Sequence, residues 1–99
     1  MIKTAGNRVS PQEIEDAALA TGLVAEAAAI GVPDERLGQA IVLVVRSRNG
    51  RSGDEDGLRA ALKRELPNFM QPKAVRWVEA MPLNPNGKID REALRKELA

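Results

Sequence analysis

The sequence predicts an α+β domain: a small three-stranded sheet packed with helices, plus an N-terminal β-hairpin. Helix-start signals precede two segments with helical spacing, and short apolar segments typical of strands lie between them. Gly, Pro and Asn residues separate the segments. Ninety-nine residues are too few for two full cores, so residues 1–99 are expected to form one domain.

The first part of the chain is predicted as a hairpin followed by a helix. Met1 to Val9 is expected to reverse around the Ala5-Gly6-Asn7 segment. The helix-start signals that follow are a capping residue at Ser10, a proline at Pro11 and the capping-box partner Glu13. Gly22 is expected to end this helix in a left-handed conformation.

Three strands are predicted for the sheet. Val24 to Val32 is rich in alanine, which also fits a helix, but its glycine and the following proline close it too soon, so a strand is favoured. Pro33 to Gly38 is expected to form a turn. Ala40 to Arg46 is apolar on both faces and is therefore expected to be central. Ala74 to Glu79 is predicted as the third strand.

Two further helices are predicted in the second half of the chain. Ser52 and Glu55 form a capping-box pattern ahead of a helix that Pro67 ends. Asp90 is expected to cap a last short helix that contains Leu94 and Leu98. The loop between the third strand and this helix holds two prolines and an Asn-Gly pair.

Composition excludes several classes of function. The chain has neither histidine nor cysteine, which removes the usual zinc sites, thiol nucleophiles, Ser-His-Asp triads and disulfides, and no metal site is expected. The net charge is +1 without a run of like charge, so no nucleic-acid partner is indicated. The longest apolar run, Ala40 to Val45, is too short to span a membrane. A cytoplasmic location is expected.

Two segments could carry chemistry, and a third, Leu66 to Pro72, could present Phe69 and Met70 to a partner, although such residues more often cover the end of the core. In Pro82 to Arg91, the Asn-Gly pair favours a turn that leaves Lys88 projecting, where it could reach a phosphate or carboxylate held by a neighbouring domain. In the N-terminal hairpin, Gly6 would allow close approach to the backbone, and Lys3 and Arg8 flank it. On residue chemistry alone, an exposed turn lysine and an ordinary hairpin are the favoured interpretations of these two segments.

Together, the segments resemble the adenylate-forming superfamily of acyl-CoA synthetases, luciferases and peptide-synthetase adenylation domains. Residues 1–15 are similar to its hinge-proximal motif, I-K-x-x-G-x-R-V-x-P-x-E-I-E. Residues 29–34, with Gly38-Gln39, are similar to its strand and turn. Residues 82–91 are similar to its closing motif, P-x-x-x-x-G-K-x-x-R. The three motifs span nearly the whole chain in the family's order, and the match is nearest to the AMP-forming acyl-CoA synthetases.

The resemblance implies a mobile C-terminal domain of an AMP-forming acyl-acid ligase whose large N-terminal domain is absent. Such ligases use ATP with Mg²⁺ to form an acyl-adenylate and then transfer the acyl group to the thiol of CoA. Lys88 is the implied catalytic and nucleotide-binding lysine of the first step. Gly6, Lys3 and Arg8 are implied on the CoA-binding face of the second step. The chain alone is expected to bind none of these cofactors and to be inactive.

Alternatives remain at this point. The segment Leu66-Pro67-x-Phe69-Met70-x-Pro72 is more like domains that load a carrier protein, so the acceptor is either CoA or a carrier-protein pantetheine. A non-catalytic α+β binding module is the alternative from another class. The resemblance also implies that lysine acyltransferases recognise Lys88. The acyl pocket is expected in the large domain.

Overall fold

A computed structural model describes residues 1–48 and 53–98. Along the chain lie β1 (Ile2–Thr4), β2 (Asn7–Val9), α1 (Pro11–Ala20), β3 (Val24–Asp34), β4 (Gly38–Ser47), α2 (Glu55–Glu65), the 3-10 turn η1 (Asn68–Met70), β5 (Ala74–Trp77) and α3 (Arg91–Leu98). The predicted α+β class and the predicted order of elements are confirmed. The alanine-rich segment that also fitted a helix is the strand β3.

The strands form one mixed sheet with β4 at its centre. β3 pairs antiparallel with the full length of β4, while β5 pairs with it in parallel and β1 meets it at Gly38. The N-terminal hairpin therefore extends the three predicted strands to a five-stranded sheet. β4 has partners on both edges, and apolar clusters cover its side chains on both faces, so residues 40–45 are all buried. The predicted central position of this strand is confirmed.

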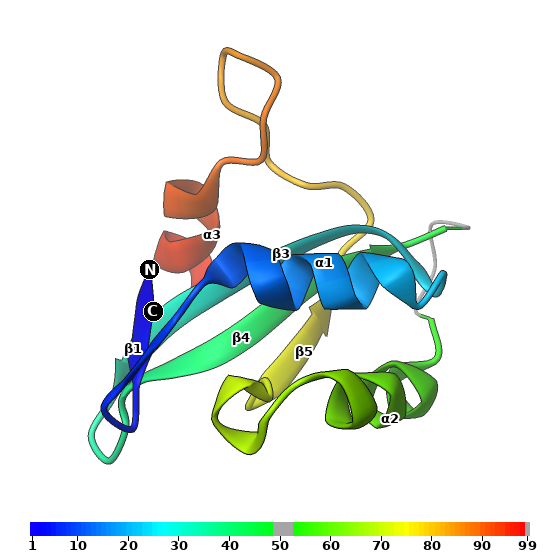
Figure 1. Ribbon diagram of the computed structural model, residues 1–99. Coiled ribbons are helices and arrows are strands. Elements are labelled where there is room, and N and C mark those ends of the chain that lie inside the picture. The colour runs from blue at the N-terminus through cyan, green and yellow to red at the C-terminus, as the bar shows by residue number, and fades with distance from the viewer. Residues whose placement is uncertain (49–52, 99) are drawn as a thin grey trace.

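The two faces of the sheet carry separate apolar clusters. On one face, α1 and α2 pack their buried residues Ile14, Leu58 and Leu62 against the sheet. On the other face, α3 contributes Leu94, and the chain that follows β5 contributes Met81. Between Met81 and α3, the segment of residues 82–90 (orange in Figure 1) leaves this second face and projects from the body of the domain.

The start signals of two helices differ from the sequence prediction. Ser10 makes no side-chain capping bond, so the first predicted capping box is wrong; its backbone oxygen accepts the N–H of Glu13 instead, at 3.2 Å. At α2, Ser52 lies outside the described residues, and the cap is Asp54, whose carboxylate accepts the N–H of Gly57 at 2.8 Å. Gly22, with φ +75°, follows the end of α1 as predicted.

The strand ends also differ from the prediction. β3 continues through Pro33 to Asp34, because the Asp34 carboxylate accepts the N–H groups of Arg36 and Leu37 and narrows the reversal to residues 35–37. A proline is compatible with β3, which is an edge strand of the sheet. β5 ends at Trp77, two residues earlier than predicted.

Candidate functional site

Lys88 lies on a hairpin-like loop, residues 82–90, which we call the lysine loop. Leu83 bridges Ile89 across its neck, and the N–H of Asp90 donates to the carbonyl of Pro82 at 2.8 Å. The reversal is completed by Gly87 at φ +78°. Lys88 is exposed, as predicted for a turn lysine. Among the described residues its ammonium group takes part in no salt bridge, which leaves its charge available to an incoming anion.

The base of the lysine loop is fixed by an ion pair between a buried carboxylate and a half-exposed guanidinium. Arg91, the first residue of α3, donates through both terminal nitrogens to the Glu15 carboxylate of α1; the Nη2–Oε1 distance is 2.8 Å. The Glu15 side chain is only 4% exposed, and its Oε2 also accepts the N–H of Ala29 in β3 at 2.8 Å. The hydrogen bonds that Arg91 donates to Glu15 raise the pKa of Arg91, and partial burial opposes this effect. One carboxylate thus joins α1, β3 and α3 where the loop ends.

Sequence reasoning assigned no role to either member of this pair. Glu15 and Arg91 are 76 residues apart in sequence, and each is only the last residue of a motif. A signal was nonetheless present, because Glu15 lies three residues before the buried Ala18 and therefore on the same face of α1, where a charged residue needs a partner. The partner itself could be identified only from the fold.

Gly6 occupies the tip of the N-terminal hairpin. Ala5 has φ +50° and Gly6 has φ +81°, which makes Ala5-Gly6 a two-residue reversal with positive φ at both positions, rather than a turn centred on Ala5-Gly6-Asn7. A Cβ added at Gly6 would meet no atom within 4 Å. The N–H of Ala5 donates to the carbonyl of Leu37 at 2.9 Å, so this tip is tied to the β3–β4 turn.

Lys3 and Arg8 are brought together by the hairpin. They are direct cross-strand partners and both are exposed, whereas Ile2 and Val9 of the same strands face the core. The N–H of Lys3 donates to the Gln39 side chain at 2.8 Å, which connects β1 to β4. Two like charges placed directly opposite each other on antiparallel strands repel. An anion bound between them would relieve this repulsion.

The predicted site residues form two groups rather than one. Lys88 lies on the projecting lysine loop, and Gly6 lies with Lys3 and Arg8 on the blue hairpin near the opposite end of the domain (Figure 1). A single reaction centre on this domain cannot use both groups at once. The arrangement suits a domain that presents one end and then the other to a partner.

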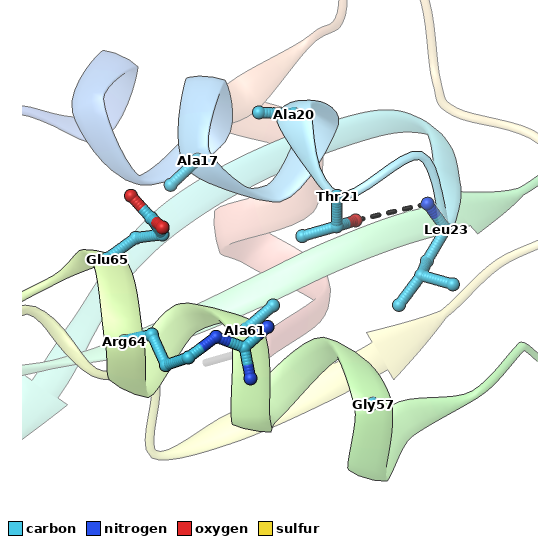
Figure 2. A pocket seen from close by; sticks show the side chains of 8 residues that line it. All are labelled: Ala17, Ala20, Thr21, Leu23, Gly57, Ala61, Arg64 and Glu65. Atoms are coloured by element: carbon cyan, nitrogen blue, oxygen red, sulfur yellow. Dashed lines mark hydrogen bonds between the residues drawn. The ribbon is translucent and has the colours of Figure 1, made fainter.

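One hollow, of about 490 Å³, belongs to neither group. It lies between α1 and α2, and Figure 2 shows its lining: Ala17, Ala20, Thr21, Leu23, Gly57, Ala61, Arg64 and Glu65. The hydroxyl oxygen of Thr21 accepts the N–H of Leu23 at 3.1 Å at its rim (Figure 2). No predicted site residue lines this hollow, and four of its eight lining residues are alanine or glycine.

Metal and membrane signals are absent from the part of the chain that the structure describes. Residues 1–48 and 53–98 contain no cluster of three or more Asp and Glu side chains that could hold a metal ion. Over the same ranges, no helix combines the length and apolar character that crossing a membrane requires.

Comparison with known proteins places this geometry in a family. The model of the AMP-binding enzyme C-terminal domain matches residues 13–88. The sulfoacetate–CoA ligase of Cupriavidus necator is 41% identical over 91 residues, which cover 92% of this chain and 18% of that protein. Acetyl-coenzyme A synthetase 2 of Pseudomonas putida is 34% identical over 99 residues, covering 97% of this chain and 15% of that protein.

Solved structures of related enzymes contain a domain with the same fold. Apo MatB from Rhodopseudomonas palustris matches with a TM-score of 0.90 and 35% identity, over 97% of this chain and 19% of that chain. ATP-bound MatB matches with a TM-score of 0.91 and 34% identity, over 98% of this chain and 19% of that chain. The chain thus spans less than one fifth of these relatives. It belongs to the AMP-binding enzyme C-terminal domain family.

Proposed function

We propose that residues 1–99 act as the mobile C-terminal catalytic domain of an AMP-forming acyl-CoA synthetase. In the first step, an oxygen of a carboxylic acid bonds to the α-phosphorus of ATP and pyrophosphate leaves. In the second step, the thiol sulfur of CoA bonds to the acyl carbon, AMP leaves and the thiol proton is released. The observation that carries this proposal is the separation of Lys88 from the Gly6 group on a domain of this family.

Lys88 suits the first step. Negative charge accumulates between the carboxylate and the α-phosphate as the adenylate forms, and a fixed cation in a site without water stabilises that charge. The lysine loop projects from the domain, so it can enter a site on the large N-terminal domain while the rest of this domain stays outside. The exposed ammonium group has no salt bridge within the described residues to break on entry.

The hairpin suits the second step. CoA carries a flexible pantetheine arm and several phosphates. Gly6 offers an exposed backbone without a side chain, along which a narrow arm could pass. Lys3 and Arg8 place two positive charges beside it, where phosphates would bind. After adenylation the domain would turn so that this end replaces the lysine loop at the large domain.

CoA is the preferred acceptor because relatives of this chain are named CoA ligases. A carrier-protein pantetheine is the second possibility, since it presents the same arm and thiol. The acid is set by the large domain: relatives that share this small domain are named for substrates as different as sulfoacetate and medium-chain acids. A non-catalytic binding module is less well supported, because it does not explain why candidate residues occur both on the lysine loop and on the N-terminal hairpin.

The remaining partners follow from the same scheme. ATP with Mg²⁺ would bind on the large domain, because the described residues of this chain offer no carboxylate cluster for the metal. Lys88 would then reach the nucleotide from outside. We place the ligase in the cytoplasm, in line with a cysteine-free chain, although related mammalian ligases are named as mitochondrial.

The test is to measure the two half-reactions separately in the complete ligase. Lys88→Ala should lower ATP–pyrophosphate exchange by about 10²–10³-fold, the effect of removing one well-placed charge stabiliser. Thiolysis of a pre-formed acyl-adenylate should be unchanged. Lys63→Ala, at an exposed position on α2, is the matched control and should change neither step. Equal loss of both half-reactions in Lys88→Ala, or no loss in either, would contradict the proposal.

A further inference from the structure

Asn84 organises the turn that carries Lys88. Its carboxamide oxygen accepts the backbone N–H groups of Asn86 and Lys88, at 2.9 and 3.1 Å. Its backbone N–H donates to the carbonyl of Lys88 at 2.8 Å, and its carbonyl accepts the N–H of Gly87 at 2.9 Å. Asn84 thus makes four hydrogen bonds, all within the turn, and three go to Asn86 and Lys88.

The turn has little else to hold it. Residues 85–88 are all exposed, so no apolar packing fixes their conformation. The neck below them is fixed by the Leu83–Ile89 bridge and by the ion pair at Arg91. The conformation of the tip therefore depends on hydrogen bonds, and those of the Asn84 side chain are the ones that a substitution can remove without touching the neck.

Both backbone polar groups of Lys88 are bonded to Asn84. This fixes the start of the lysine side chain before any ligand arrives, although the ammonium group at its end remains exposed. A charge that is already in place stabilises a transition state more than one that must first be ordered, because no reorganisation is needed at the moment of reaction.

We propose that Asn84 is a positioning residue for Lys88: its carboxamide holds the turn in the conformation that presents the lysine for adenylate formation. This inference rests on the proposed function and adds a residue to it. Asn84 itself need not touch ATP or the acid. Its contribution should therefore be confined to the step that uses Lys88 and should vary with the hydrogen-bonding capacity of the side chain at position 84.

The first experiment measures the turn directly, by amide hydrogen exchange on the 99-residue chain. Asn84→Ala should speed exchange at the amides of Asn86 and Lys88 and leave that of Asp90, in the neck, unchanged. Asn84→Ser should be intermediate, because a serine hydroxyl supports the same kind of turn more weakly. Equal exchange at Asn86 and Lys88 in all three proteins would overturn the structural half of the proposal.

The second experiment measures both half-reactions in the complete ligase. Asn84→Ala should lower kcat for ATP–pyrophosphate exchange by about 10–100-fold, as expected for a misplaced catalytic group, without changing thiolysis of a pre-formed acyl-adenylate. Asn84→Ser should recover part of the rate. Asn86→Ala is the matched control, since Asn86 contributes its backbone N–H to the network and that group is kept; it should exchange pyrophosphate at the normal rate.

The outcomes separate this inference from the proposed function. If Lys88→Ala lowers adenylation and Asn84→Ala behaves like Asn86→Ala, the positioning role is overturned and the proposed function stands. If Asn84→Ala lowers both half-reactions equally, the residue supports folding only, and the role is again overturned. If Lys88→Ala leaves adenylation unchanged, both proposals fail. Loss confined to adenylation, graded from Asn to Ser to Ala, supports both.

Discussion

Replacing Gly6 with leucine should block thiol transfer while leaving adenylation intact, and the structure supplies a closely matched control at Gly22. Both glycines are exposed, with φ angles of +81° and +75°. A Cβ added at either position meets no atom within 4 Å. The backbone cost of a side chain is therefore the same at the two sites, and only Gly6 lies at the proposed pantetheine path.

The expected stability loss follows from the backbone conformation. A non-glycine residue in the left-handed region costs about 1–2 kcal/mol. For a domain of this size, each kcal/mol corresponds to a fall in Tm of about 4–8 °C. Gly6→Leu and Gly22→Leu should therefore lower the free energy of unfolding of the 99-residue chain equally. A domain with an ordinary Tm of about 45–65 °C would remain folded in an assay at about 25 °C after either change.

The assay mixes a pre-formed acyl-adenylate on the complete ligase with CoA and follows release of AMP. Gly6→Leu should slow this step by about 100-fold, because a displaced thiol no longer reaches the acyl carbon, whereas Gly22→Leu should react normally. Pyrophosphate exchange should be normal in both. The reasoning is refuted if both variants lose thiolysis to the same degree, or if Gly6→Leu reacts with CoA at the normal rate.

Three further predictions concern the packing of the core, the loss of stability at low pH and the covalent modification of Lys88. Leu43→Ala, at a fully buried position of β4, should lower the free energy of unfolding by about 2–5 kcal/mol in a urea titration; a loss below about 1 kcal/mol would contradict the packing. The pKa of Asp34 is lowered chiefly by the N–H groups of Leu37 and Arg36, and Lys73 adds to this. Its contribution is therefore complete above the usual carboxyl pKa and is lost as the pH falls through the lower folded-state value. Asp34→Asn should flatten the fall of Tm below about pH 4, and unchanged steepness would exclude this carboxylate as a cause. Acetylation of Lys88 removes its charge, so the acetylated ligase should lose pyrophosphate exchange, keep its Tm and thiolysis, and recover on deacetylation. Mass spectrometry of the native ligase should find Lys88 acetylated; its absence in every growth condition where other lysines are modified would count against a switch.

The elements with a continuous apolar pattern were predicted well from sequence. β4 is apolar at every position from Ala40 to Val45, which is the pattern of a strand covered on both faces. The start of α3 was also predicted correctly, since Asp90 accepts the N–H of Ala93 at 3.0 Å. In both cases the deciding signal lies within a few residues of the feature.

Helix starts were predicted less well where several nearby groups could make the capping hydrogen bond. Two cap-type residues, Ser52 and Asp54, precede α2, and Asp54 at the position next to the helix makes the capping bond. At α1 the backbone bond from Glu13 to Ser10 replaces the side-chain cap. Hydrogen-bonding residue types indicate that a helix starts nearby, but they do not determine which group bonds.

The candidate site also combines features that local sequence predicts with one that it does not. The positions of Lys88 and Gly6 followed from turn chemistry, because each lies in a short segment with glycine at a positive φ. The roles assigned to them remain proposals. The pair formed by Glu15 and Arg91 was missed, because a contact between residues so distant in sequence depends on how α1, β3 and α3 pack together.

Glu15 has a consequence for self-association as well. β3 is the outer strand on its side of the sheet, and such a strand can template the addition of a strand from another molecule. Here the N–H of Ala29 already donates to the Glu15 carboxylate. Pro33, further along the same edge, has no N–H to donate. An incoming strand would have to displace a buried charge and would still find a missing donor. The carboxylate that anchors the lysine loop therefore also makes this edge a poorer template for an added strand.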